Sequence, residues 1–352
     1  MGRIWNVKRP AFFPAFLLLF MGSVLLTGCQ PKVAQPITRT ELHLNTVVTV
    51  TIYDSADEAL LDEAMALCEY YEAIFSRTLE TAELARLNAA AKDPANTGQA
   101  LPVSEDLAAL IEQGLFYSEL SGGAFDITLE PVSSLWDFSS AGEKTAPDPA
   151  AIEASLPLVD HRQVALETDP DSIIIFQQAG MGLDVGAIAK GYIADRMKEH
   201  LISRGVTSAT INLGGNLLCI GEKTGDQPFK IGIQKPFADH SETIAYMEIR
   251  DASVVTSGIY ERCFEDEGQF YHHLLNPQTG YPYFNDLISV TIVSPDSVDG
   301  DALSTACFAL GLEEGMKLLD DLDGIYGVFI TRDYGIYYSE GFLDAIPVTE
   351  MK

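Results

Sequence analysis

The chain has 352 residues, of which 22 are Lys or Arg and 51 are Asp or Glu, giving a formal charge of −29 at neutral pH. So acidic a protein repels nucleic acids, and this excludes a nucleic-acid-binding function. It also repels the phosphates of a nucleotide, so any nucleotide site must supply its own positive charge from a metal ion, backbone amides or single lysines.

The N-terminal segment has the features of an export signal. Three basic residues precede an apolar run over residues 15–26, which leads into Leu26-Thr27-Gly28-Cys29. The run is shorter than the roughly 20 apolar residues of a spanning helix, so we expect residues 1–28 to be a cleaved signal peptide. The residues before Cys29 match a lipobox, which predicts lipidation of Cys29. An ordinary signal followed by an incidental cysteine is the alternative.

This segment also predicts location and domain organisation. We expect an exported protein that is lipid-anchored to the outer face of the cytoplasmic membrane, or to the periplasmic side of a membrane. Residues 29–38 would form the lipidated tether, and residues 39–345 a single folded domain. Removing residues 1–28, which hold three basic and no acidic residues, leaves 19 Lys and Arg against 51 acidic residues, a formal charge of −32.

The spacing of apolar residues predicts the elements in chain order. We expect a strand over 40–53, helices over 58–75, 84–91 and 105–120, an exposed connection with a short helix over 136–157, a strand over 172–176, a helix over 188–204, strands over 208–213, 229–234, 244–249, 253–256, 270–275 and 287–293, helices over 301–310 and 313–319, and a hairpin over 327–338. Runs of strands with helices between them predict an α+β fold of layered, mostly antiparallel sheets.

Four further cysteines, Cys68, Cys219, Cys263 and Cys307, stand in apolar or mixed segments without a CxxC spacing. Thiolate metal binding is therefore disfavoured, and small buried side chains are expected. Two disulfides remain open, and spacing alone does not pair them.

Three glycine-rich segments could let a backbone approach a flat or phosphorylated ligand: Ser121–Asp126, Asp184–Gly191 and Asn212–Asn216. Each could equally be a simple turn. In the second segment Lys190 stands at the predicted start of a helix, and both a lysine and a helix N-terminus favour phosphate. A solvated surface lysine is the alternative.

Asp301 and Thr305 are four residues apart at a predicted helix start, so they share a face. A carboxylate and a hydroxyl, completed by a carbonyl, water and phosphate oxygens, are ligands typical of Mg²⁺. Alternatively, Asp301 only complements the helix dipole.

His272 and His273 lie at the end of a predicted strand, where neighbouring side chains point to opposite faces. Only one of them can therefore face a site. Zinc is disfavoured, because no second ligand stands at the right spacing.

In this order the segments resemble the ApbE family of FAD:protein FMN transferases over residues 40–340. The residues that carry the resemblance are Ser121–Asp126 with Thr128, Asp184–Asp195, Asn212–Gly215, Thr256–Gly258 with Tyr260, Glu261 and Arg262, His273–Gly280, and Asp301–Thr305 with Gly311; Phe75-Ser76 and Leu87-Asn88 fit as well. There are two departures: Leu44-Asn45-Thr46 replaces the family's usual Met-Gly-Thr, and Asn276-Pro277 its usual Asp-Pro.

The resemblance implies a site for FAD and Mg²⁺. The implied FAD contacts are Leu44, Thr78, Ala124, Phe125, Asp126, Asp184, Lys190 and His273, and the implied Mg²⁺ ligands are Asp301, Thr305 and the backbone carbonyl of Ala187. Mg²⁺ and Lys190 would neutralise the pyrophosphate that the acidic surface repels.

The resemblance also implies the reaction. A Thr or Ser hydroxyl of an exported target flavoprotein, of the kind found in Nqr or Rnf complexes, would attack the FMN-side phosphorus of FAD, and AMP would leave. His273, Asp301 and Lys190 are the expected catalytic residues, with His273 or an aspartate as the base. An FAD pyrophosphatase that uses water, and a flavin-binding lipoprotein without turnover, are the two alternatives.

Overall fold

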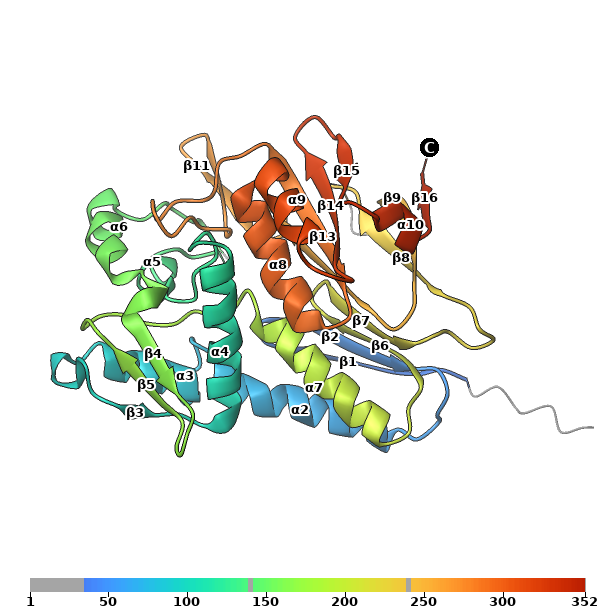
Figure 1. Ribbon diagram of the computed structural model, residues 1–352, viewed down its shortest axis with the longest axis horizontal. Helices are drawn as coiled ribbons and strands as arrows, with labels where there is room; N and C mark the ends of the chain where they lie inside the picture. Colours follow the sequence, from blue (N-terminus) through green and yellow to red (C-terminus); the bar gives the residue numbers. More distant parts are fainter. Residues whose placement is uncertain (1–34, 139–141, 239–241, 352) are drawn as a thin grey trace, which may run out of the picture. The chain divides into compact units, whose positions relative to one another are not determined.

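An eight-stranded sheet lies at the centre of the fold in the computed structural model, which describes residues 35–138, 142–238 and 242–351 (Figure 1). In spatial order its strands are β1 (Ile37–His43), β2 (Thr46–Ile52), β6 (Ser208–Leu213), β7 (Asn216–Gly221), β10 (Ser253–Gly258), β13 (Leu287–Ser294), β14 (Tyr326–Thr331) and β15 (Ile336–Tyr338). All neighbouring pairs are antiparallel, so the predicted fold class is confirmed. Every residue of β13 is buried, which shows that the sheet is covered on both faces at its centre.

Three smaller sheets surround the large one. They are β3 (Leu101–Pro102), β5 (Ile173–Phe176) and β4 (Val164–Glu167); β16 (Val348–Glu350), β9 (Thr243–Ile249) and β8 (Phe229–Gln234); and the hairpin of β11 (Cys263–Asp266) and β12 (Gln269–His272). The β11–β12 hairpin ends at the two histidines. It therefore carries them to the site described below.

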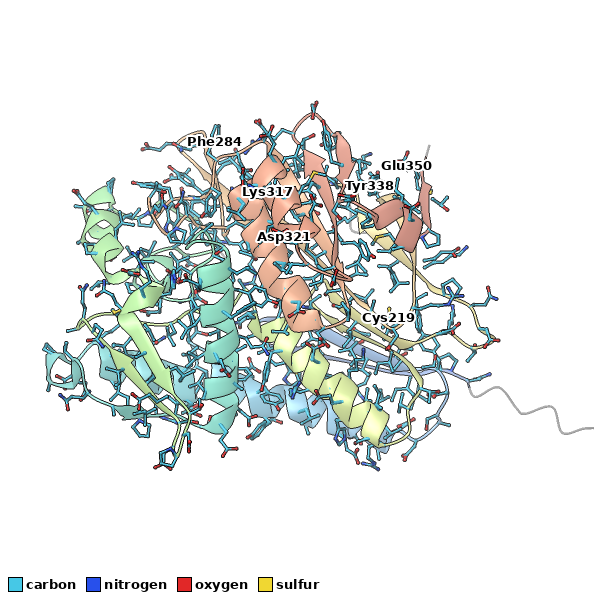
Figure 2. All side chains as sticks on the ribbon, in the orientation of Figure 1. Cys219, Phe284, Lys317, Asp321, Tyr338 and Glu350 are labelled. Atoms are coloured by element: carbon cyan, nitrogen blue, oxygen red, sulfur yellow. The ribbon has the colours of Figure 1, made fainter. Side chains whose placement is uncertain are left out.

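Helices α2, α7, α8 and α9 pack in a row along the large sheet, and α4 packs against α2 and α8 (Figure 1). The helices are α2 (Ala59–Phe75), α3 (Glu83–Ala91), α4 (Glu105–Leu120), α5 (Glu130–Ser133), α6 (Pro149–Ser155), α7 (Ala189–Ser203), α8 (Ser297–Leu310), α9 (Leu312–Asp320) and α10 (Phe342–Ala345), with 3₁₀ turns η1 (Pro94–Asn96), η2 (Leu156–Leu158) and η3 (His161–Gln163). Their apolar spacing explains this packing. In α9, for example, Gly315 and Leu319 are buried, whereas Lys317 and Asp321 at its C-terminal end, both labelled in Figure 2, are exposed.

The first predicted strand is a hairpin of two strands. Leu44 and Asn45 have φ angles of 53° and 55°, and His43 pairs with Thr46 across them. A two-residue turn with both φ angles positive matches the right-handed twist of the flanking strands. Across this turn the inward-facing positions change from odd-numbered residues in β1 to even-numbered residues in β2, so a single strand over 40–53 could not keep one face buried.

One prediction of exposure and two predictions of element boundaries were wrong. The connection over 136–157 is not exposed throughout, because Trp136 packs with Val132, Ile152 and Leu275 in a second apolar cluster. Its indole N–H donates to the carbonyl of Gly280 at 2.9 Å. The predicted strand over 270–275 ends at His272, and the predicted helix from Asp301 begins four residues earlier, at Ser297.

The predicted signal peptide, Cys29 and residues 29–34 of the tether lie outside the described residues. The first strand begins at Ile37, two residues before the expected domain start, and β16 pairs with β9 beyond the expected end at residue 345. In the described ranges no helix is both long and apolar enough to cross a membrane.

All four described cysteines are free thiols, and three of them are buried. This agrees with their expected role as small buried side chains.

Candidate active site

Helices α7 and α8 bring together Lys190 and Asp301, which are 111 residues apart in the chain. The Lys190 Nζ lies 3.0 Å from Oδ1 and 3.4 Å from Oδ2 of Asp301. The backbone N–H of Gly191 donates to Oδ2 at 3.0 Å. Only 4% of the Asp301 side chain is exposed, so these donors stabilise a carboxylate that water hardly reaches.

The interpretation of Asp301 as a helix cap is wrong. The N-cap of α8 is Asp296, and Asp301 is the fifth residue of the helix. Its side chain therefore does not accept from the first free N–H groups of its own helix. It accepts from α7 instead, at the end where Lys190 stands.

The hydroxyl of Thr305 lies on the same helix, one turn after Asp301. Its Oγ1 is 3.1 Å from the Oγ of Ser257 in β10, which is also 2.8 Å from the Oγ of Ser304. Ser257 belongs to a segment that carries the family resemblance, but no function was predicted for it. A hydroxyl beside Thr305 orients that side chain, so Ser257 is a further residue of the site.

Asp184 is held by three donors from different elements. Its Oδ2 accepts from the Ser133 hydroxyl at 2.6 Å and lies 3.0 Å from the Arg77 Nε, while its Oδ1 accepts from the Gly186 N–H at 3.0 Å. Arg77 was missed from sequence, although it stands next to the predicted contact Thr78. It supplies a second cation to this acidic molecule.

The carbonyl of Ala187 lies just before α7, whose N-cap is Ile188, and no backbone N–H of the described residues donates to it. The N–H of Gly191 is one of the first N–H groups of α7, which have no acceptor within their own helix. Here it donates to Asp301. The Ala187 carbonyl is thus left as an acceptor beside the N-terminus of α7.

The two adjacent histidines differ in their hydrogen bonds. His272 is buried, its Nε2 donates to the Tyr283 carbonyl at 3.0 Å, and its Nδ1 accepts from the Leu274 N–H at 3.3 Å. The Nδ1 of His273 is buried and has no partner among the described residues. This is consistent with the prediction that one histidine is structural and that His273 is free to bind a ligand.

Burial and nearby cations keep His273 neutral. Burial is the largest cause, followed by Arg262 and His272, with Lys190 a smaller one, and together they lower the pKa of His273 to about 3. The pKa of His272 is lowered to about 4, again mainly by burial. In the absence of a ligand, His273 is therefore a neutral group and a weak base.

The loop after α4 has a rigid backbone, because its polar groups are already bonded. Gly122 and Gly123 have φ angles of 62° and 80°, which glycine adopts without strain. The Ser121 hydroxyl accepts from the Phe125 N–H, and the Tyr283 hydroxyl donates to the Ala124 carbonyl. Phe125 is itself buried.

Asp126 faces inward, away from a role as a ligand. Its Oδ1 accepts from the backbone and hydroxyl of Thr128, at 2.8 and 2.6 Å. Its Oδ2 contacts the backbone N–H and Nδ1 of His161, at 3.1 and 2.9 Å. The carboxylate of Asp126 thus holds the loop in place.

Leu44 and Thr78, the remaining predicted FAD contacts, both lie near the C-terminal end of α2. The N–H of Leu44 donates to Glu72 Oε1 at 2.9 Å, which fixes the hairpin tip against the last turn of α2. Thr78 is exposed, immediately after Arg77.

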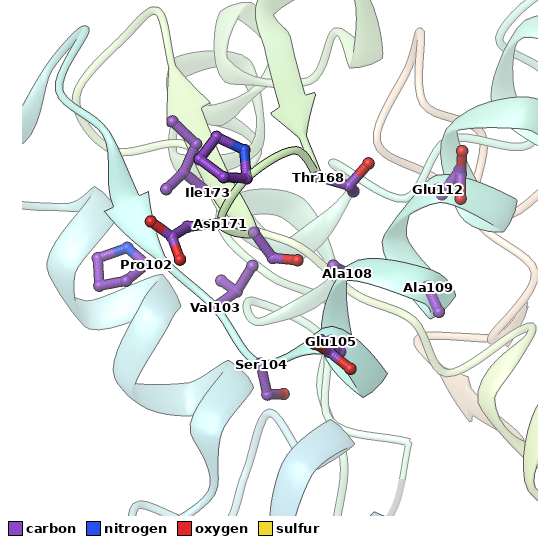
Figure 3. A pocket seen from close by; sticks show the side chains of 12 residues that line it. Pro102, Val103, Ser104, Glu105, Ala108, Ala109, Glu112, Thr168, Asp171 and Ile173 are labelled. Atoms are coloured by element: carbon purple, nitrogen blue, oxygen red, sulfur yellow. The ribbon is translucent and has the colours of Figure 1, made fainter.

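A pocket of about 670 Å³ lies elsewhere, between the start of α4 and the turn before β5 (Figure 3). Its charged lining residues are Glu105, Glu112 and Asp171, and none of the predicted site residues lines it. An acidic pocket without a cation cannot attract a pyrophosphate, so we do not assign FAD to it.

No group of three or more His, Cys, Asp or Glu side chains among the described residues could enclose a metal ion. One carboxylate, one hydroxyl and one carbonyl nevertheless fit Mg²⁺, which keeps several waters and binds through one or two carboxylates and substrate phosphates.

Comparisons with known proteins identify the family of this chain. The sequence profile of the ApbE family matches residues 44–329. The chain belongs to the ApbE family. It is 37% identical over 332 residues to an FAD:protein FMN transferase of Treponema pallidum, covering 89% of this chain and 90% of that protein. An FAD:protein FMN transferase of Klebsiella pneumoniae is 40% identical over 286 residues, or 81% and 86% of the two chains.

The crystal structure of the ApbE protein of Thermotoga maritima has the same fold. It superimposes with a TM-score of 0.78 at 29% sequence identity, covering 88% of this chain and 98% of that one. The ApbE profile ends at residue 329, so β15, α10 and β16 lie outside the matched region.

Proposed function

We propose that this chain is an FAD:protein FMN transferase, which cleaves FAD and transfers its FMN half onto a hydroxyl of another protein, releasing AMP. Membership of the ApbE family and the names of its relatives support the activity. The observation that carries the assignment of the site is the Lys190–Asp301 pair next to Thr305 and the unpartnered Nδ1 of His273.

We propose Asp301, Thr305 and the Ala187 carbonyl as Mg²⁺ ligands. When bound, Mg²⁺ would supply charge stabilisation to the pyrophosphate. Lys190 lies beside Asp301, where it would hold phosphate oxygens by charge-assisted hydrogen bonds. Arg77 and Lys190 would together offset the field of the acidic surface.

The flavin end of FAD would lie along residues whose backbones are fixed. Leu44, Thr78 and the backbone of Ala124–Asp126 are the proposed contacts, with Asp184 held in place by Arg77 and Ser133. Rigid contacts of this kind position the FMN-side phosphorus for in-line attack, which provides much of the catalysis in phosphoryl-type transfer.

His273 is the proposed acceptor for the proton of the attacking hydroxyl. With a pKa of about 3 it is a poor base in the free protein, since a base works best near the operating pH. The negative pyrophosphate bound beside it would raise that pKa. His273 would then become a competent base only when FAD is present, which limits attack to the loaded site.

The acceptor, the anchor and the location are further proposals. A Thr or Ser of an exported flavoprotein, of the Nqr or Rnf kind, is the proposed acceptor. Lipidation of Cys29 after removal of residues 1–28 would hold the enzyme on the outer face of the cytoplasmic membrane, or on the periplasmic side of a membrane.

The test uses residues 35–352, which form a compact unit. This protein is incubated with FAD, Mg²⁺ and a threonine-bearing acceptor domain, and the acceptor is examined by in-gel flavin fluorescence and mass analysis. Transferase activity predicts a fluorescent acceptor and an equal amount of AMP. FMN and AMP free in solution, with an unmodified acceptor, would instead indicate an FAD pyrophosphatase. Bound FAD without AMP would indicate a flavin-binding protein.

A further inference from the structure

The N-terminus of α8 is bonded to α7 through a carboxylate that has no assigned function. Asp195 belongs to α7 and is buried. Its Oδ1 accepts from the N–H of Ser297 at 2.8 Å, and its Oδ2 accepts from the N–H of Val298 at 2.8 Å. These are among the first N–H groups of α8, which have no acceptor within their own helix.

A second carboxylate makes the reverse connection one turn further on. Asp301 of α8 accepts from the N–H of Gly191 of α7 at 3.0 Å. Each helix thus gives a carboxylate to the backbone of the other. We call this arrangement, formed by Asp195, Ser297, Val298, Gly191 and Asp301, the reciprocal clasp.

The two helices approach closely at the clasp, and glycine is required there. A Cβ atom on Gly191 would lie 2.3 Å from the carbonyl oxygen of Ser297 and 2.6 Å from the Cα of Val298. Backbone atoms cannot turn away from such a contact as a flexible side chain can. Any side chain at this position would push the helices apart and separate Lys190 from Asp301.

The same end of α8 is also attached to the sheet. The Ser297 hydroxyl donates to Asn216 Oδ1 at 2.7 Å, and the Ser253 hydroxyl donates to Ser297 Oγ at 2.8 Å. Asn216 and Ser253 belong to β7 and β10. The sheet therefore fixes where α8 begins, and Asp195 fixes how α7 lies against it.

We propose that Asp195 is a positioning residue for FMN transfer, which sets the register of α7 against α8 so that Lys190 and Asp301 meet. This inference rests on the proposed roles of Lys190 and Asp301. Asp195 would touch neither FAD nor the acceptor hydroxyl. It acts through the backbones of the two helices that carry those groups.

The test compares Asp195→Asn with Asp299→Asn in the full chain. An asparagine at 195 keeps one acceptor oxygen but turns an amide N–H₂ toward a backbone N–H, so one of the two bonds is lost. Asp299 is a carboxylate in the first turn of α8 that accepts from the Tyr117 hydroxyl of α4 and is not part of the clasp. It controls for loss of a negative charge at the same helix end.

For Asp195→Asn we expect kcat for FMN transfer to fall about tenfold, the scale seen when outer-shell partners of ligands are removed. The KM values for FAD and acceptor should stay close to wild type, and the Mg²⁺ concentration for half-maximal transfer should rise. Asp299→Asn should leave all three near wild type. Gly191→Ala, where it folds, should change the same parameters as Asp195→Asn.

Two results would overturn the proposal. One is a wild-type kcat in Asp195→Asn. The other is an equal fall in kcat in both variants that follows their loss of thermal stability, because this would indicate a merely structural role. If the wild-type protein still transferred FMN after chelation, the proposed Mg²⁺ ligands would be wrong. The proposal for Asp195 would then still be tested by the kcat and KM values of the variants.

Discussion

Replacing Asp301 by Asn tests whether this carboxylate is a metal ligand, and the structure sets the expected cost. The acidic composition alone predicts that removing a carboxylate from an acidic site is neutral or stabilising. The structure reverses that prediction, because the Asp301 carboxylate accepts hydrogen bonds from Lys190 and from the N–H of Gly191. An asparagine keeps one acceptor oxygen, but its amide N–H₂ meets another donor.

The size of the effect follows from these contacts. Leaving a buried donor without a partner costs about 1–3 kcal/mol. The larger cost of removing one partner from a buried ion pair, about 3–5 kcal/mol, is not expected here. The reason is that Lys190 keeps 24% of its side chain exposed and can turn toward water. For a unit spanning Gln35–Lys352, a loss of about 1–3 kcal/mol in the free energy of unfolding corresponds to a fall in Tm of about 2–5 °C.

The assay measures Tm without Mg²⁺ and the FMN-transfer rate over a range of Mg²⁺ concentrations. If Asp301 binds Mg²⁺, the transfer rate should fall by about 10²–10³, the scale of losing one preorganised electrostatic contact, and should recover in part at high Mg²⁺. Asp299→Asn, two residues earlier on the same helix, should transfer at nearly the wild-type rate. An Asp301→Asn protein with wild-type transfer at low Mg²⁺ would remove Asp301 from the site and weaken the assignment of Thr305.

Three further predictions test the rest of the site. Excess EDTA should abolish FMN transfer while some FAD stays bound, measured by flavin fluorescence after gel filtration; full transfer in EDTA would refute the role of the metal. Cys29→Ala should abolish incorporation of labelled lipid while the protein still transfers FMN, and labelled Cys29→Ala protein would refute the lipobox. Because burial lowers the pKa of His273 from 6.5 to about 3, its neutral form stabilises the fold above pH 6.5, and that contribution is lost as the pH falls toward 3. As the pH falls from 6.5 to 3, the free energy of unfolding in urea should therefore decrease less for His273→Gln than for wild type. If the free energies of the two proteins fell in parallel with pH, the lowered pKa of His273 would be wrong.

Local patterns predicted most of the fold, because they depend on neighbouring residues. The N-cap at Ser104 accepts from the N–H of Leu107, as its position before Glu105 and Asp106 predicts. The start of α8 was misplaced because Ser297–Gly300 has no apolar spacing of its own, and Asp195 of α7 satisfies its free N–H groups. No local pattern reports an acceptor that comes from another helix.

Sequence patterns indicated the residues on which the proposed site depends, but not the residues that hold them in place. Lys190, Asp301 and Thr305 are residue types with an evident chemistry and a helical spacing, so sequence alone singled them out. Arg77 and Ser257 are ordinary surface-type residues whose function depends on Asp184 and Thr305, which lie far from them in the chain. The alternation of side chains along a strand predicted that only one of His272 and His273 faces the site, but it could not predict the partner of His272, the carbonyl of Tyr283.

The separation of 111 residues along the chain between Lys190 and Asp301 affects how the enzyme gains activity during folding. Closing so long a loop has an entropic cost that only completed tertiary contacts repay, so such contacts form late. A chain with only its first half folded has Lys190 without its carboxylate. FAD cleavage should then switch on in a single step when α8 docks on α7, which makes catalytic activity itself a reporter of the last stage of folding.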